Sequence, residues 1–420
     1  MVTRRNAIRL FICAVSAALA LGCLPESGRH FSVYFLLLSP LLNLCGAAAC
    51  RTFGALSLLC LPLLLLPLAK GRFFCWRLCP MGFLAESAGR LNTRNAGLVR
   101  RVPHLGKGLA VLIAASALAG YPVLIWTDPL CLFTGFFAAW RQPLTWAAGT
   151  TAIGFALVLL LSLLVPNVWC HRLCPLGGLE EWLTQLANAF RAARRTGAKS
   201  SGLADNVQVG RRIFLGFAAG GAAGLAYRKI KGAPPLAAAI RPPGSAHPNF
   251  NALCSRCGNC MKACPYALIV PDLGATGIDG LFTPVLKFRS QNSRQENFCF
   301  QGCTACTQAC PTGAIRLLKE AEKKQVRIGM ARINKKACIA WEKGEYCVVC
   351  QEFCPYQAIV EVKQKGVNCP IVDEAVCRGC GACESQCPAK PIAIVVEGCM
   401  PQPRLPAAVS PQAANRPAQS

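Results

Sequence analysis

The feature that most constrains this chain is a set of four cysteine motifs, each of which ends in Cys-Pro, within residues 254–388. The first and the last have the spacing C-x2-C-x2-C-x3-C-P; the second and third have longer first gaps. In bacterial ferredoxins with this spacing, three close thiolates hold one [4Fe-4S] cluster and the fourth reaches its neighbour. The sequence therefore predicts four clusters. The expected ligands are Cys254, Cys257, Cys260, Cys264, Cys299, Cys303, Cys306, Cys310, Cys338, Cys347, Cys350, Cys354, Cys377, Cys380, Cys383 and Cys387.

Two other uses of these cysteines fit the pattern less well. Zinc also takes four thiolates, but zinc sites favour two separated C-x2-C pairs and lack the final Cys-Pro. Disulfides between cysteines so close along the chain would be strained. Cys369 and Cys399 lie outside the motifs, and we expect them to pack or to form a mutual disulfide. Iron–sulfur binding is therefore the favoured interpretation.

The formal charge of +26 raises the possibility of a nucleic-acid partner, so its distribution matters. An oxidised cluster with four thiolates carries a charge of about −2, and four clusters would offset much of the positive charge of the C-terminal part. The remaining excess lies beside apolar segments. Nucleic-acid binding is therefore not expected.

Apolar stretches in the first half have lengths close to the roughly 20 residues of a membrane span. The expected fold class is an α-helical membrane domain, with about four spans and a fifth anchor or export segment, followed by an α+β ferredoxin-like polyferredoxin domain. A cleaved signal peptide is the alternative for the first stretch. The four expected spans are Leu10–Leu24, Thr52–Ala69, Gly108–Trp126 and Trp146–Val165.

An internal repeat links two parts of this half. Ser39-Pro40 and Asp128-Pro129 each precede an apolar segment, and each copy ends in C-x3-C-P. The basic residues place both C-x3-C-P motifs on the cytoplasmic side of the expected spans. Three roles stay open for their thiols, namely one shared cluster, redox-active thiols or helix-end packing. The four cysteines are Cys75, Cys79, Cys170 and Cys174.

The fifth apolar segment, residues 213–227, follows the pair Arg211-Arg212, which is typical of a twin-arginine export signal. That export route accepts folded cargo, as a domain loaded with clusters in the cytoplasm requires. The expected location is therefore the bacterial inner membrane, with the four-cluster domain facing the periplasm. Whether the segment is cleaved stays open.

These motifs together resemble NapH and NapG, the ferredoxin-type subunits that serve periplasmic nitrate reductase, and their relatives MauN and MauM. Both halves look fused in one chain, although residues 180–202 lack the cysteines that NapH-type proteins usually carry there. The resemblance implies a NapH-like domain and a NapG-like domain. The expected divisions are residues 1–186 (NapH-like), 187–231 (linker and export segment), 232–399 (NapG-like) and 400–420 (disordered tail).

The resemblance also implies that membrane quinol donates electrons, which would pass through the clusters to a periplasmic redox enzyme. The chain would then be a component of a quinol dehydrogenase. The alternative is an assembly or maturation factor for a periplasmic metalloenzyme. Asp128 is the only acid of its expected outer loop, where it either accepts quinol protons or forms a turn before Pro129. No C-x2-C-H haem motif is present.

Overall fold

The computed structural model describes residues 4–21, 35–51, 60–92, 96–139, 149–196, 218–222, 239–247, 249–289, 298–364 and 366–406. The chain divides into two compact units. The first comprises residues 1–234, 249–259 and 309–314, and the second comprises residues 235–248, 260–308 and 315–420. The domain boundaries expected from the sequence stay predictions. The pair Arg211-Arg212 and the tail from residue 407 lie outside the described residues.

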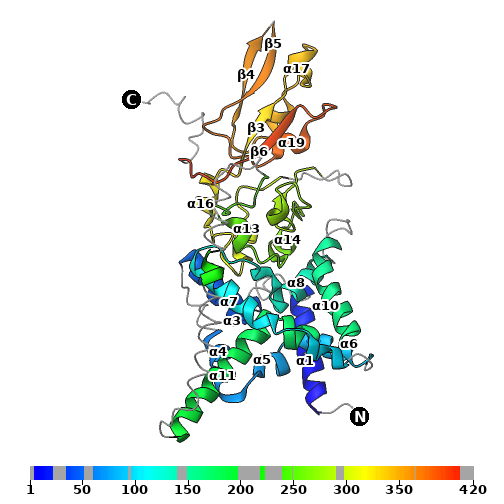
Figure 1. Ribbon diagram of the computed structural model, residues 1–420. Helices are drawn as coiled ribbons and strands as arrows, with labels where there is room; N and C mark the ends of the chain where they lie inside the picture. The colour runs from blue at the N-terminus through cyan, green and yellow to red at the C-terminus, as the bar shows by residue number, and fades with distance from the viewer. Residues whose placement is uncertain are drawn as a thin grey trace. The chain divides into compact units, whose positions relative to one another are not determined.

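The first unit is built from helices, most of them short (Figure 1). Its α-helices are α1 (Arg4–Leu21), α3 (Pro40–Cys50), α4 (Leu61–Lys70), α5 (Phe73–Arg77), α6 (Pro80–Gly89), α7 (Leu105–Leu118), α8 (Pro129–Ala139), α10 (Ile153–Leu164), α11 (Pro175–Thr196) and α13 (Phe250–Leu253). Short 3-10 turns are η3 (Ala96–Arg101), η4 (Ile125–Thr127) and η5 (Thr150–Ala152), and η6 (Trp169–Leu173) is a π-helical turn.

Two glycines bring α7 and α11 into close contact. A Cβ on Gly178 would lie 2.3 Å from the backbone carbon of Gly106, and a Cβ on Gly106 would lie 2.5 Å from the carbonyl oxygen of Cys174. Only residues without a Cβ permit this approach. The crossing therefore fixes the start of α11, and with it Cys174, against α7.

The expected membrane spans are not found, because no helix within the described ranges is long and apolar enough to cross a membrane. α4, α7 and α10 have 10, 14 and 12 residues. At the α-helical rise of 1.5 Å per residue, the longest of these covers about 21 Å of the roughly 30 Å needed. α1 is longer but includes three arginines. The predicted α-helical membrane domain is therefore wrong.

Part of the apolar surface of these stretches, together with that of α8, packs short helices against one another. Ile113 of α7, Phe133 of α8 and Phe155 of α10 are buried. The ring centroids of Phe133 and Phe155 lie 6.2 Å apart in an edge-to-face arrangement. α10 packs on both α6 and α8. Of the fifth apolar segment, only residues 218–222 are described.

The second unit contains short helices and three antiparallel strand pairs among its described residues. Its strands are β1 (Ile269–Pro271), β2 (Pro284–Leu286), β3 (Gly329–Ile333), β4 (Ile359–Gln364), β5 (Val367–Val372) and β6 (Ile394–Gly398). Its helices are α15 (Ala305–Gln308), α16 (Glu320–Gln325), α17 (Ile339–Glu342), α18 (Val349–Glu352), α19 (Ala382–Gln386) and the 3-10 turn η7 (Ile278–Gly280). The chain passes from one unit to the other within α14 (Asn259–Ala263).

The strand pairs lie close to the cysteine motifs in sequence. β1 pairs with β2, β4 with β5, and β3 with β6, so that Gly329 opposes Gly398 and Ile333 opposes Ile394. β-Prone runs follow the first, third and fourth motifs in the sequence, and they form β1, β4 and β6. The run at residues 313–317, after the second motif, is not a strand. The long-range β3–β6 pair ties the start of the third motif to the end of the fourth.

Candidate iron–sulfur sites

The third and fourth motifs exchange their last cysteines. A small cavity has Cys338, Cys347 and Cys350 of the third motif on its wall together with Cys387 of the fourth, among apolar side chains. Burial, with smaller contributions from the other three cysteines, raises the pKa of the Cys350 thiol to about 12. Four thiols around one cavity, two of them buried and two partly buried, are what a cubane cluster needs. We call this group site III.

The reciprocal group contains Cys377, Cys380 and Cys383 of the fourth motif with Cys354 of the third. Burial raises the pKa of Cys383, and the other three thiols are close enough to add to that shift. The backbone N–H of Ala358 donates to the Sγ of Cys354 at 3.3 Å. Such N–H···S bonds stabilise thiolate sulfur. We call this group site IV.

The second motif forms a similar group with the last cysteine of the first motif. Burial raises the pKa of Cys306, with smaller contributions from Cys299, Cys264 and Cys303. We call these four cysteines site II. Lys323 of α16 is only 4% exposed, and its ammonium opposes the rise in the pKa of Cys299 that burial causes. The sequence analysis missed this lysine because it lies 13 residues beyond the motif.

The remaining motif cysteines fall on both sides of the boundary between the units. Cys254, Cys257 and Cys310 belong to the first unit and Cys260 to the second. Burial raises the pKa of Cys254 to about 12, and Arg256 opposes this rise while Cys257 and Cys310 add to it.

Sites II and IV are neighbours in the second unit. The backbone N–H of Cys299 donates to the carbonyl oxygen of Cys380 at 2.9 Å. Burial raises the pKa of the Tyr356 phenol, and the nearby thiols of Cys380 and Cys299 raise it further. The guanidinium of Arg378 lies over the Tyr356 ring, 5.9 Å from its centroid. A continuous series of thiol groups therefore runs from site II through site IV to site III.

The two C-x3-C-P motifs lie together in the first unit, and we call Cys75, Cys79, Cys170 and Cys174 the quartet. Burial raises the pKa of Cys75 well above its usual value, and Glu180, Cys174, Cys79 and Cys170 all add to the shift. A Cβ placed on Gly177 would lie 2.9 Å from the Cys170 carbonyl oxygen and 3.7 Å from the Cys75 Sγ, so this glycine lets α11 pack closely against both motifs. The sequence repeat thus becomes one group of four thiols.

Each Cys-Pro pair of the quartet also begins a helix. Cys79 precedes Pro80 at the start of α6, and its Sγ accepts from the backbone N–H of Gly82 at 3.4 Å. Cys174 precedes Pro175 at the start of α11, where its Sγ accepts from Gly177 at the same distance. Proline suits the first helical position and the sulfur satisfies an end N–H. This capping role is compatible with metal ligation, since a thiolate ligand also benefits from N–H donors.

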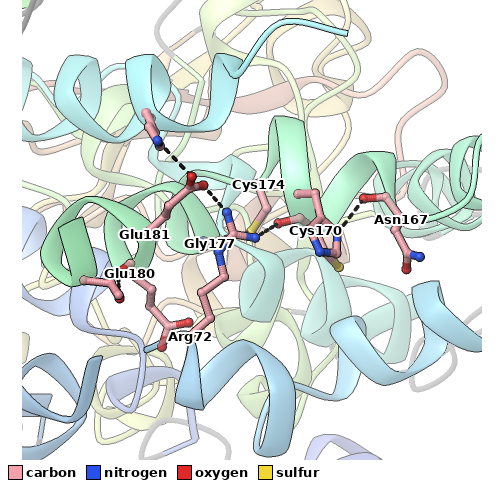
Figure 2. A network of polar contacts seen from close by, with 10 residues as sticks. Arg72, Asn167, Cys170, Cys174, Gly177, Glu180 and Glu181 are labelled. Carbon is pink, nitrogen blue, oxygen red and sulfur yellow. Dashed lines mark hydrogen bonds and ion pairs between the residues drawn. The ribbon is translucent and has the colours of Figure 1, made fainter. Parts of the chain in front are cut away.

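A polar network supports the quartet (Figure 2). Glu180 of α11 accepts from the backbone N–H groups of Phe74 and Cys75 at 3.0 and 3.2 Å. Arg72 donates to the Cys170 carbonyl at 3.3 Å and to the carboxylate of Glu181. The network therefore connects both motifs through residues that the sequence analysis did not select.

Asp128 and Ser39, the equivalent residues of the two repeats, meet in the core. The Ser39 hydroxyl donates to Asp128 Oδ2 at 2.5 Å, and Leu130 N–H donates to Oδ1 at 2.9 Å. Burial raises the pKa of Asp128 to about 6, and these hydrogen bonds oppose the rise. Asp128 is thus a helix cap at the start of α8, and its proton-accepting role stays a prediction.

The two cysteines outside the motifs do not form the alternative disulfide, since both Cys369 and Cys399 are free. Their thiols donate to the carbonyls of Ala340 at 3.5 Å and Arg327 at 3.4 Å. No three Cys, His, Asp or Glu side chains among the described residues are grouped tightly enough to hold a single metal ion. A cubane takes one thiolate on each of four irons, so its ligands stand farther apart than those of one ion.

Comparison with known protein families gives two matches. A family described as a 4Fe-4S dicluster domain matches residues 253–315, which include the first two ferredoxin motifs. A family described as a 4Fe-4S binding domain matches residues 52–101 and 147–193, which include the quartet. Iron–sulfur families therefore match in both the first half of the chain and the ferredoxin motifs.

Relatives are found among characterised ferredoxin-type proteins. The methylamine utilization ferredoxin-type protein MauM of Methylophilus methylotrophus is 34% identical over 165 residues, covering 36% of this chain and 67% of the relative. MauM of Paracoccus denitrificans is 32% identical over 213 residues, 46% of this chain and 87% of the relative. The ferredoxin-type protein NapF of Escherichia coli K12 is 32% identical over 156 residues, 36% and 82% respectively.

No solved structure matches the chain significantly. The matches bear out the predicted relation to MauM, and NapG of Escherichia coli is 31% identical over 162 residues. They do not show that the first half corresponds to NapH or MauN, so the fusion stays a prediction.

Proposed function

Because the chain belongs to the family of ferredoxin-type iron–sulfur electron-transfer proteins, we propose that it is a relay whose sixteen motif cysteines hold four [4Fe-4S] clusters. The observation that supports this most is the exchange of Cys354 and Cys387 between the third and fourth motifs. It gives each group four thiols, one for each iron of a cubane, and it would set the two clusters side by side.

The order of the relay follows from the neighbours of each site. Site IV shares the exchanged motifs with site III and contacts site II through Cys299 and Cys380. Electrons would therefore pass between sites II and III by way of site IV, not in the order of the motifs along the chain. The ferredoxin spacing assigns Cys254, Cys257, Cys260 and Cys310 to the remaining cluster, site I.

We further propose that the quartet holds a fifth [4Fe-4S] cluster. Its four thiols come from two sequence segments that match one 4Fe-4S binding family. The backbone N–H groups that donate to the Sγ atoms of Cys79 and Cys174 suit thiolate ligands. When bound, the cluster would accept and release single electrons. The chain's own contribution is to bury its ligands and hold them with Glu180 and Arg72.

Kinship to MauM and NapF supports a redox enzyme chain as the partner. Membrane quinol was expected as the donor from the resemblance to NapH and NapG and from the predicted spans; it stays a prediction, and the spans no longer support it. A periplasmic location also stays a prediction, since Arg211-Arg212 lies outside the described residues. The second candidate function is cluster delivery to a partner metalloenzyme.

A direct test separates the relay from the delivery factor. The loaded protein is reduced with dithionite, desalted and mixed either with cytochrome c or with aconitase lacking its cluster. A relay should reduce cytochrome c over repeated cycles and keep its iron. Transfer of iron to aconitase, with recovery of aconitase activity, would instead identify a delivery factor.

A further inference from the structure

A basic groove of about 860 Å³ lies beside the quartet in the first unit. Its wall includes Arg72, Trp76 and Arg77 of the segment around α5, and His171 and Arg172 of η6. Among the described residues on this wall, Glu181 is the only acidic one. We define the basic groove by these six residues.

The positive charge of the groove is only partly compensated. The carboxylate of Glu181 is shared between Arg72 and Lys107, whose Nζ lies 2.9 Å from it. Arg77 and Arg172 make no ion pair with any residue in the described part of the chain. Arg77 lies instead over the Phe73 ring, 5.1 Å from its centroid. At least two guanidinium groups therefore remain available to an anionic partner.

The pKa of His104, which also lines the groove, reflects this excess of positive charge. Burial lowers the pKa of His104, and the charges of Arg172, Lys107 and Arg72 lower it further, against the opposing effect of Glu181. The positive potential thus extends over the groove and not only at single side chains.

The groove is also adjacent to the thiols of the quartet. Trp76 directly follows Cys75, and His171 directly follows Cys170. Both cysteines are only partly buried, whereas Cys79 and Cys174 are buried. Arg72 bonds to the Cys170 carbonyl. A molecule in the groove would therefore lie next to the most accessible side of the quartet.

The open form of the groove indicates what it binds. Trp76 is 58% exposed, and Arg77 and His171 are also exposed. A small-molecule site usually buries most of its ligand, whereas exposed Trp and Arg are typical anchors of protein interfaces. Complementary charge is what speeds the encounter of two redox proteins.

We propose that the basic groove docks an acidic surface of a redox partner protein and that electrons cross there to or from the quartet. This proposal rests on the proposed function. Each crossing moves one electron, so that the donor's cofactor is oxidised by one electron and the quartet's cluster is reduced by one, with no bond formed or broken. Arg77 and Arg172 would recognise carboxylates and Trp76 would supply the apolar contact.

The test uses the full, cluster-loaded protein and fluorescein-labelled deca-glutamate as an acidic probe. Wild type should bind the probe with an affinity that falls as salt rises. The double variant Arg77→Glu/Arg172→Glu should bind at least tenfold more weakly. Lys343→Glu/Lys363→Glu makes the same charge change at exposed residues of the second unit and should bind within twofold of wild type.

Electron transfer gives the second measurement. Reduction of the clusters by a reduced, acidic plant-type [2Fe-2S] ferredoxin should slow at least tenfold in the groove variant, while reduction by dithionite is unchanged. Equal binding and equal rates in the groove and control variants would overturn the docking proposal. So would displacement of the probe by an equimolar amount of phosphate or citrate, which would make the groove a small-anion site.

Iron content is measured on the same samples. A protein without iron at the quartet contradicts the proposed fifth cluster. A fully loaded protein whose groove variant behaves as wild type contradicts only the docking site.

Discussion

Lys323 is a buried cation beside the thiols of site II. Its ammonium bonds to the Phe300 carbonyl and interacts with Cys299. A nearby positive charge favours the reduced, more negative cluster. Lys323→Met should therefore lower the reduction potential of site II by roughly 100 mV, on the scale of one charge at an effective dielectric of 20.

The control is Lys324→Met, which removes an exposed lysine from the same helix. Potentials followed by spin resonance in a redox titration should shift in the first variant and barely in the second. Equal potentials for Lys323→Met and wild type would show that the ammonium does not act on this cluster.

Asp128 should make stability depend on pH. Its pKa is about 6 in the folded chain against a usual 3.8, so the folded state holds the proton more tightly. The stabilisation is complete below about pH 4 and is lost as pH rises through 6, by about 3 kcal/mol in total. Relative to Asp128→Asn, wild type should lose roughly 1.5 kcal/mol of unfolding free energy between pH 5 and 8.

Urea unfolding at pH 5 and pH 8 measures this difference. Glu86→Gln is the control: burial would raise the pKa of Glu86, but bonds from Arg9 and Arg90 lower it overall. Its effect should therefore be the same at both pH values. A pH-independent difference between Asp128→Asn and wild type would mean that Asp128 keeps an ordinary pKa.

At the scale of elements, the exchange of cysteines between motifs predicts which pairs of substitutions remove one cluster and which remove two. Cys354→Ala should remove one [4Fe-4S] centre. Adding Cys383→Ala should remove no further centre, because both thiols belong to site IV. Adding Cys347→Ala should remove a second, because that thiol belongs to site III. Mössbauer spectroscopy of the intact centres provides the count, and the reverse pattern would mean that each motif holds its own cluster.

Much of the candidate site was predictable from the sequence, because cysteine spacing determines which thiols can reach one cluster. The sixteen motif cysteines and the repeat that brings Cys75 and Cys170 together were recognised this way. Lys323, Glu180 and the pair of sites II and IV were not. These residues and sites lie far apart in the sequence and come together only when the chain folds, so cysteine spacing does not indicate them.

The membrane spans show where hydropathy alone fails. A run such as Leu61–Lys70 is apolar enough for lipid, but a ten-residue helix is too short to cross a membrane, and it includes Pro67. Apolar side chains of other such runs, Ile113 and Phe155 among them, are buried between short neighbouring helices instead. Hydropathy averaged over a sequence window does not distinguish a membrane span from a set of short packed helices. It also does not predict the close contact of α7 and α11 at Gly106 and Gly178.

At the scale of the whole molecule, the two units combine two kinds of cysteine site in one chain. The ferredoxin motifs supply exchanged groups, and the helical repeat supplies the quartet. A relay needs each group to bind its own cubane, so the number of clusters decides whether the chain can act as one. We propose five clusters, four held by the motifs and one by the quartet.

Iron and acid-labile sulfide per chain, measured after anaerobic purification, test this claim most directly. The protein should hold about twenty of each, and replacing all four quartet cysteines by alanine should leave about sixteen. A native content of sixteen that the quartet variant does not change would remove the fifth cluster. Zinc in place of iron would contradict the account as a whole.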